Sequence, residues 1–264
     1  MMKKLFSLVL AFCFILAASV SSLAEIDLGT QITAEDYYDA QNAALDQSKE
    51  QSLNQKRISS RATYISIPMT VYPQIVSYYC GPASAYMAIK SLGYSVTSSS
   101  ASLYFFEGCQ SSCPYPGVTH TCYKQYTSPQ VTLANEMGTS YSGTSISTVK
   151  NTINSHIGSS YYACHTIANT SAGTTDLVNK VSSTLEDDHP AVCWVEARDL
   201  DHYSGSAGQS FGGHFICIYY INMSTLSIGI KDCNYYSGLG GTYTEDADTL
   251  RVAMYHSGAN NLIW

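Results

Sequence analysis

The last third of the chain carries three strand-like runs, AVCWVEAR from residue 191, GGHFICIYYIN from residue 212 and LSIGIKDCN from residue 226. The central run is the most apolar of the chain, which is typical of a buried strand. Short or Gly/Ser-rich segments separate the runs, so we expect antiparallel neighbours. Segments with the apolar spacing of helices precede them, at 82–93, at 145–157 with Ser145 as a possible cap, and at 174–188. A cysteine-bearing loop is expected after the first of these, to about residue 130, and a last helix-like piece, TEDADTLRVAMYH at 244–256, follows the strand-like runs. This order, helices followed by an antiparallel sheet, predicts an α+β domain.

The first 24 residues have the pattern of a secretory signal peptide. Two lysines precede an apolar run from Leu5 to Val20, and SLA at 22–24 matches a small-x-small cleavage site. The run is shorter than the roughly 20 residues of a membrane-spanning helix, and no other stretch is long and apolar enough. We therefore expect a secreted, extracellular protein with no stable membrane insertion after signal removal.

Residues 25–61 form a polar segment rich in Gln, Ala, Glu and Asp. Two interpretations stay open: a weak helix or disordered linker, or a propeptide released near Lys56-Arg57 or Arg61. From Ala62 the composition changes, and apolar and polar residues alternate in ATYISIPM as they do in a strand. We therefore place the folded domain at residues 62–264.

The charge balance excludes one class of partner. The chain has 13 basic and 20 acidic residues and no basic stripe, so nucleic acid is not an expected partner. Charged residues make up only 12% of the chain and tyrosines number 22. We therefore expect a surface rich in tyrosine and small hydroxyl residues. Such a surface does not indicate a particular ligand. No cofactor is expected.

Of the nine cysteines, Cys13 lies in the signal segment. Three others crowd into CQSSCPYPGVTHTC at 109–122, where we favour a local disulfide over zinc binding with His120. Cys193 and Cys217 lie in apolar strand-like runs and are expected to be small buried hydrophobes. The pairing of the cysteines cannot be deduced from one sequence.

Cys80 is the candidate nucleophile. It precedes Gly81-Pro82 and the segment ASAYMAIKSLGY, where proline at the first turn and Gly93 at the end predict a helix. A thiol attacks a carbonyl as the thiolate, and a helix N-terminus or an adjacent imidazolium favours that anion. The local sequence provides the helix N-terminus, because Cys80 directly precedes the predicted helix. The base has to come from elsewhere in the chain.

Seven histidines compete for the role of base, and His214 is the best placed. It follows Gly212-Gly213 and begins the run FICIYY, so it stands at the end of a predicted strand where glycine permits close approach. An ordinary histidine at a strand end is the alternative. His202, beside Asp201, has no nucleophile near it in the sequence, and we interpret this pair as a solvated loop.

Asp232 and Gln74 complete the candidate site. Asp232 ends the next strand-like run, and two antiparallel strands joined by a short turn can bring it beside His214, where a carboxylate orients the imidazole. Asn234 is the fallback for this role. Gln74, six residues before Cys80, can stabilise an oxyanion through its side-chain amide, together with the Cys80 backbone N–H.

Gln74-x5-Cys80, then GGHF, then a strand-borne Asp232 resemble a papain-like cysteine peptidase. More narrowly, YYCGPAS, GHFICIYYIN and IKDCNYYSG resemble the bacteriocin-leader (double-glycine) peptidase-like family over about residues 64–240. The resemblance implies a papain-like α+β fold, in which an N-terminal helix carries the nucleophile and packs on an antiparallel sheet. It also implies Cys80 as nucleophile, His214 as base, Asp232 as orienter and Gln74 as oxyanion helper.

Three features depart from that family. Cys233 stands where proline often follows the aspartate, and the inserts at 109–122 and 199–213 are outside the pattern. With a signal peptide and no transporter, leader-peptide processing does not transfer to this chain. We therefore expect a secreted cysteine peptidase acting on a peptide or protein substrate. The alternatives are an acyltransferase or transglutaminase-like enzyme with the same residues, or a non-catalytic surface or binding protein.

Overall fold

A computed structural model describes residues 34–56, 63–104, 123–204, 212–234, 239–258 and 261–264. The chain divides into two compact units, residues 1–41 and 42–264. The following fold is that of the second unit.

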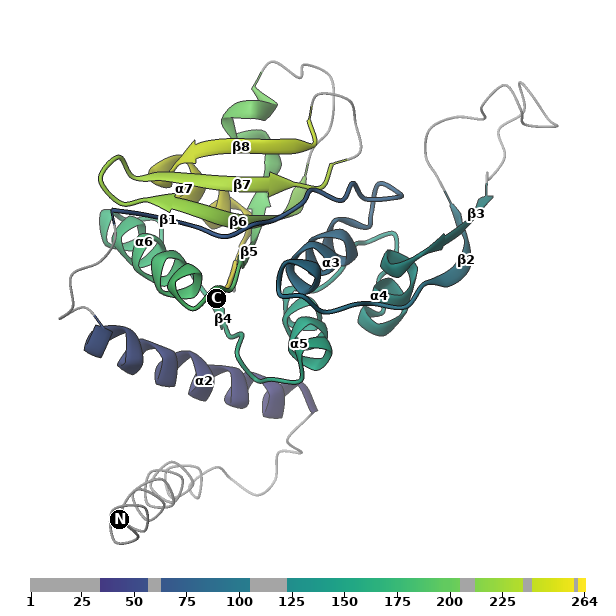
Figure 1. The fold of residues 1–264 in the computed structure, drawn as a ribbon, viewed down its shortest axis with the longest axis horizontal. Helices are drawn as coiled ribbons and strands as arrows, with labels where there is room; N and C mark the ends of the chain where they lie inside the picture. Colours follow the sequence, from purple (N-terminus) through teal and green to yellow (C-terminus); the bar gives the residue numbers. More distant parts are fainter. Residues whose placement is uncertain (1–33, 57–62, 105–122, 205–211, 235–238, 259–260) are drawn as a thin grey trace, which may run out of the picture. The chain divides into compact units, whose positions relative to one another are not determined.

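Seven strands within the described ranges form one antiparallel sheet (Figure 1). Its order is β4-β9-β5-β6-β7-β8, and β1 pairs with the distal end of β6. The strands are β1 Tyr64–Ser66, β4 Cys164–His165, β5 Ala191–Glu196, β6 Gly213–Asn222, β7 Ser227–Asp232, β8 Gly241–Asp246 and β9 Leu262–Ile263. A separate hairpin joins β2 Ser99–Tyr104 to β3 Tyr123–Ser128.

The helices begin and end where local residues favour it. They are α2 Ala34–Lys56, α3 Cys80–Ser91, α4 Pro129–Met137, α5 Ile146–Ile157, α6 Ser171–Glu186 and α7 Ala247–Ser257. The expected cap of α5 is confirmed, because the Ser145 hydroxyl accepts the Thr148 N–H. Gly158 ends the same helix with φ of 63°, a conformation that suits glycine.

Strand β6 is covered on both faces. Ile216 and Ile218 belong to the core that includes α6 and α7 residues, whereas Phe215 and Cys217 belong to the core formed with α3 and α5. Burial on both faces explains why this strand is an apolar run rather than an alternating one. The Ser84 hydroxyl of α3 donates to Phe215 O at 3.0 Å, which joins that helix to β6. The predicted α+β class is confirmed.

Some expectations from the sequence need correction. The stretch up to about residue 130 was expected to be one loop, yet strands β2 and β3 flank its centre and α4 follows. The expected helix TEDADTLRVAMYH begins only at Ala247, because Thr244–Asp246 end strand β8. Cys193 and Cys217 are buried free thiols, as predicted. The expected disulfide within 109–122 and the expected signal peptide lie outside the described residues.

Residues 42–56 form the larger part of helix α2 and are bonded to the domain. Asn42 exchanges two hydrogen bonds with the backbone of Cys164. Asp46 contacts His165 Nδ1 at 2.7 Å and accepts the Trp264 indole N–H at 2.7 Å. Leu53 is fully buried in the core that also contains Trp264. This part of the polar segment is therefore a helix that packs on the domain, and its release as a propeptide stays a prediction.

His165 makes the attachment of α2 dependent on pH. Burial alone lowers the pKa of His165, but its bonds to Asp176 and Asp46 outweigh burial and raise the pKa to about 9. A raised folded-state pKa contributes stability that is complete below about pH 6.5 and is lost as the pH rises through about 9. We compare the unfolding free energies of wild type and His165→Gln at two pH values. The advantage of wild type should be about 2 kcal/mol larger at pH 6 than at pH 10. A difference independent of pH would contradict this.

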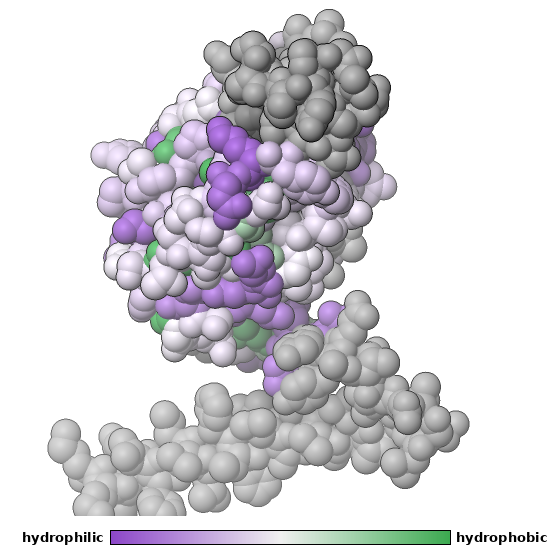
Figure 2. Space-filling view, turned by 90° about the vertical axis from the view of Figure 1, so that its right-hand side faces the viewer, coloured by the Kyte–Doolittle hydropathy of each residue, from purple (hydrophilic) through white to green (hydrophobic). Residues whose placement is uncertain are grey.

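Within the described ranges, no helix is long and apolar enough to cross a membrane. Figure 2 shows one face of the molecule, on which most of the coloured surface is pale. Strongly hydrophilic residues gather in a few clusters there, and apolar areas are small. This agrees with the low content of charged residues in the sequence.

Candidate active site

Cys80 is the first residue of α3 and is largely buried, with 6% of its surface exposed. Tyr79 precedes the helix and provides no side-chain cap, so the partial positive charge of the helix start is not satisfied by a capping group. A Cβ atom at Gly81 would lie 2.8 Å from the Thr144 side chain. The small residue after Cys80 therefore lets the helix start pack closely against the segment before α5.

His214 is the second residue of β6, and its side chain is 9% exposed. A Cβ atom at Gly213 would lie 1.9 Å from the Trp194 ring, so this glycine is required where β5 and β6 approach one another. The expectation that glycine before His214 permits close approach is confirmed for Trp194. The tight packing holds the start of β6 in place.

Asp232 is the last residue of β7 and is fully buried. Its partner in the ladder is Ile216, so His214 is its diagonal neighbour on the adjacent strand. His214 Nε2 and Asp232 Oδ1 lie 2.9 Å apart. The two residues that the sequence expected to meet across β6 and β7 are in contact.

The electrostatics of this pair favour an ion pair. Burial alone lowers the pKa of His214, but the charge of Asp232 and hydrogen bonds with Asp232, Cys233 and Cys80 raise it well above the usual value. Burial alone raises the pKa of Asp232, but the charge of His214 and hydrogen bonds from His202, His214 and the Asn234 N–H hold it well below its usual range. Because Asp232 engages Nε2, the other ring nitrogen, Nδ1, is the atom left to exchange a hydrogen bond with the thiols of Cys80 and Cys233.

Gln74 lies beside this group and is 4% exposed. Its backbone N–H donates to Cys233 O at 2.7 Å, which ties the segment before α3 to the end of β7. Its side-chain Nε2 donates to Val76 O at 3.1 Å and to Ser77 O at 2.9 Å. Both amide hydrogens are thus engaged, and stabilising an oxyanion requires one of these bonds to be exchanged.

Asn234, the fallback orienter, is bonded elsewhere in the same cluster. Its backbone N–H donates to Asp232 Oδ1 at 2.7 Å, and its side-chain Nδ2 donates to the Tyr203 hydroxyl at 2.9 Å. The first bond supports the carboxylate that contacts His214. Of the two candidates, Asp232 is the one with a carboxylate at hydrogen-bonding distance from the ring.

Cys233 is a buried thiol at the centre of the site. Its Sγ lies 3.6 Å from Gln74 Oε1 and 3.6 Å from Cys80 O. Burial, which is the largest influence, raises the pKa of this thiol. Cys233 is therefore a buried, protonated thiol that packs between Gln74, the start of α3 and His214. The sequence indicated a place for Cys233 in the site only through its position directly after Asp232.

The interpretation of Asp201-His202 as a solvated loop pair is wrong for His202. Its side chain is 6% exposed, because the short helix η2 Asp201–Tyr203 folds back over β7 and β8. His202 Nε2 lies 3.1 Å from Asp232 Oδ2, and the Tyr203 hydroxyl donates to the same oxygen at 3.0 Å. Sequence reasoning missed both contacts, since the loop lacks a periodic pattern.

Two groups of described residues have metal-ligating atoms within 4.8 Å of one another: His214, Asp232 and Cys233, and Glu50, His165 and Asp176. In the first group the His214–Asp232 hydrogen bond accounts for the proximity. In the second, His165 bonds Asp176, and Lys180 forms ion pairs with Glu50 and Asp176. Internal charge pairing explains both groups without an ion.

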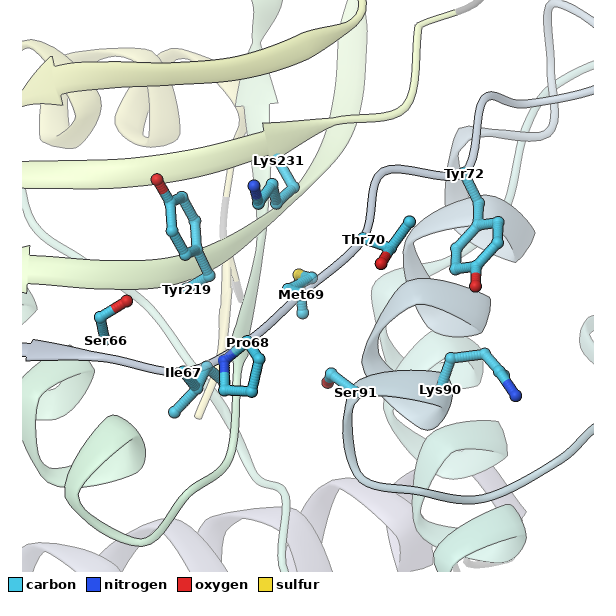
Figure 3. Close-up of a pocket in the computed structure, with 10 residues that line it drawn as sticks. All are labelled: Ser66, Ile67, Pro68, Met69, Thr70, Tyr72, Lys90, Ser91, Tyr219 and Lys231. Carbon is cyan, nitrogen blue, oxygen red and sulfur yellow. The ribbon is translucent and has the colours of Figure 1, made fainter.

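A pocket of about 790 Å³ lies at the opposite end of α3 from Cys80 (Figure 3). Lys90 and Ser91 line it from the helix, and Tyr219 and Lys231 line it from the sheet. The rest of the lining is Ser66 at the end of β1 and residues 67–70 and 72 of the segment that follows. An α-helix rises about 1.5 Å per residue, so Lys90 lies roughly 15 Å along the axis from Cys80. The pocket contains none of the four candidate site residues.

One comparison with known proteins identifies a relationship. The model of a family described as the Peptidase_C39 like family matches residues 65–256, which is most of the chain. The match includes all four candidate site residues. A search of curated proteins found no match.

Proposed function

The chain belongs to the Peptidase_C39 like family, with a papain-like α+β fold, and from this premise we propose that it is a cysteine peptidase that uses Cys80, His214, Asp232 and Gln74. The observation that carries the proposal is the buried His214 ring, whose Nε2 lies 2.9 Å from Asp232 Oδ1 and whose pKa is raised by the charge of Asp232 and by hydrogen bonding with groups that include the Cys80 thiol. An imidazole between an acid and a thiol at a helix start is the arrangement that activates a cysteine nucleophile.

In the proposed reaction the resting site holds a thiolate–imidazolium pair, formed by transfer of the Cys80 thiol proton to His214 Nδ1. The thiolate attacks the carbonyl carbon of a peptide bond, and the Cys80 backbone N–H and the Gln74 amide stabilise the oxyanion. His214 then donates its proton to the leaving amine, which leaves an acyl-enzyme thioester. Water, deprotonated by His214, releases the acid and restores the thiol. Asp232 stabilises the imidazolium throughout and holds the tautomer.

Two further parts of the proposal concern the setting of the reaction. We propose that the protein is secreted, on the basis of the signal-peptide pattern of residues 1–24. The substrate is a peptide or a protein, as expected of a peptidase family. Acyl transfer to an amine uses the same thioester and is the competing outcome that an experiment has to separate.

The proposal is tested by incubating the purified protein with an unfolded protein such as reduced casein and identifying the products by mass spectrometry. We expect new peptide termini with wild type and none with Cys80→Ala. Cys193→Ala is the matched control, because it removes a buried thiol that lies in the other core. Amide products with an added amine would show acyl transfer instead. Cleavage by Cys80→Ala at the wild-type rate would contradict the mechanism.

A further inference from the structure

His202 lies between two carboxylates, and each of its ring nitrogens faces one of them. Nε2 is 3.1 Å from Asp232 Oδ2, and Nδ1 is 2.8 Å from Glu245 Oε1. Both carboxylate side chains are almost fully buried, at 0% and 1% exposure. The Tyr243 ring stacks on the imidazole at a centroid distance of 3.9 Å and an angle of 11°.

This geometry determines the charge of His202. An ionised carboxylate only accepts hydrogen bonds, and a neutral imidazole has a single N–H donor. Two ionised acceptors on the two nitrogens therefore require the imidazolium, which donates at both positions. Burial alone lowers the pKa of His202, but the bonds to Asp232 and Glu245 outweigh it and raise the pKa. A buried cation between two buried anions also avoids leaving either charge uncompensated.

We propose that His202 is a positively charged positioning residue of the active site, held by Glu245, which fixes and partly neutralises Asp232 behind the His214–Cys80 pair. This inference rests on the proposed peptidase mechanism and adds two residues to it. His202 touches no reacting atom and acts through Asp232.

The hydrogen bonds at Asp232 show what His202 contributes. Oδ1 accepts from His214 and from the Asn234 N–H, whereas Oδ2 accepts from His202 and the Tyr203 hydroxyl. Four donors thus prevent the carboxylate from rotating away from His214. The Tyr203 hydroxyl is neutral, so His202 is the cation on the far side of Asp232.

The charge of His202 also affects protonation at the reactive pair. Groups that face His202 with charge or titratable protons are Asp232 on β7, Glu245 and Tyr243 on β8, and Tyr203 beside it on η2. His214 lies behind Asp232. Removing the cation leaves the environment of Cys80 and His214 more negative, which raises their affinity for protons. Removing the Glu245 charge acts in the opposite direction.

The test measures the rate of Cys80 alkylation by iodoacetamide between pH 4 and 9, with the Cys80 peptide quantified by mass spectrometry. For wild type we expect a rise in rate at acidic pH, where the thiolate–imidazolium pair forms. In His202→Gln the midpoint of this rise should move up by about one pH unit, the effect of one charge at roughly 10 Å. In Glu245→Gln it should move down, and in the double variant it should return close to the wild-type value.

His156→Gln is the matched control. It removes a histidine from a His156–Glu136 pair at 2.7 Å that joins α5 to α4, and the midpoint should not change. The proposal would be overturned if the midpoints of both single variants moved in the same direction, or if neither moved. Loss of packing alone has no reason to shift the two midpoints in opposite directions, whereas removal of opposite charges does. If His202→Gln fails to fold, the direction of the Glu245→Gln shift decides.

The same measurement separates this inference from the proposed function. If His214→Ala alkylates at Cys80 like wild type at every pH, the peptidase mechanism itself fails. If His214→Ala abolishes the acidic rise but His202→Gln and Glu245→Gln reproduce the wild-type profile, only the role of His202 and Glu245 is lost.

Discussion

Replacing Asp232 with asparagine is expected to lower kcat/KM for peptide cleavage by about 10³- to 10⁴-fold, the effect of neutralising the orienting acid of a catalytic triad. The structure adds a second reason for a large effect. Asp232 accepts hydrogen bonds from His214, His202, Tyr203 and the Asn234 N–H. An asparagine would direct its own NH₂ group at some of these donors and leave the His202 cation with one carboxylate fewer.

The measurement is peptide cleavage over a range of substrate concentrations, with the melting temperature recorded for each variant. Asp248→Asn is the matched control, because Asp248 lies on α7 with 61% of its side chain exposed. We expect this control to retain wild-type kcat/KM. If Asp232→Asn folds and cleaves within tenfold of wild type, Asp232 does not orient His214 in the way proposed.

Removing residues 1–62 is expected to destabilise the domain strongly, although the sequence allowed this segment to be a linker or a propeptide. The truncation deletes Leu53 from the core, and it removes the Asp46 partner of His165 and Trp264. It also removes Glu50, an ion-pair partner of the buried Lys180. Burying an unpaired charge or opening a core cavity each costs about 2 to 5 kcal/mol, so the melting temperature should fall by roughly 10 °C or more.

The comparison is between a chain that begins at residue 34 and one that begins at residue 63, both followed by thermal unfolding. Leu53→Ala isolates the core contribution and should cost about 2 to 4 kcal/mol. Gln51→Ala, on the exposed side of the same helix, should change stability little. An unchanged melting temperature in the shorter chain would show that the helix is dispensable, as expected of a released propeptide.

Residue chemistry and periodicity predicted the parts of the site that depend on adjacent elements. The apolar run of β6 and the strand ending at Asp232 placed His214 and Asp232 together, since a short turn joins their strands. The helix opening at Cys80 followed from Gly81-Pro82. These inferences needed only local spacing and the ordinary pairing of consecutive strands.

The sequence did not predict the contacts made through polar segments distant in the chain. His202 reaches Asp232 because the η2 turn folds over β7 and β8, and no periodic pattern marks such a turn. Its second partner, Glu245, lies near the end of β8, where the sequence pattern from Thr244 predicts a helix. Helix α2 has a polar surface, and its attachment relies mainly on hydrogen bonds and ion pairs rather than on an apolar stripe.

The most direct test of the central claim is to treat the native protein with a peptidyl electrophile, such as a peptide chloromethyl ketone, and locate the adduct by mass spectrometry. The account predicts one adduct, on Cys80, formed quickly in wild type, slowly in His214→Ala and not at all in Cys80→Ala. Equal labelling of Cys80→Ala and wild type, or an adduct on Cys233 in place of Cys80, would contradict the assignment of Cys80 as the nucleophile.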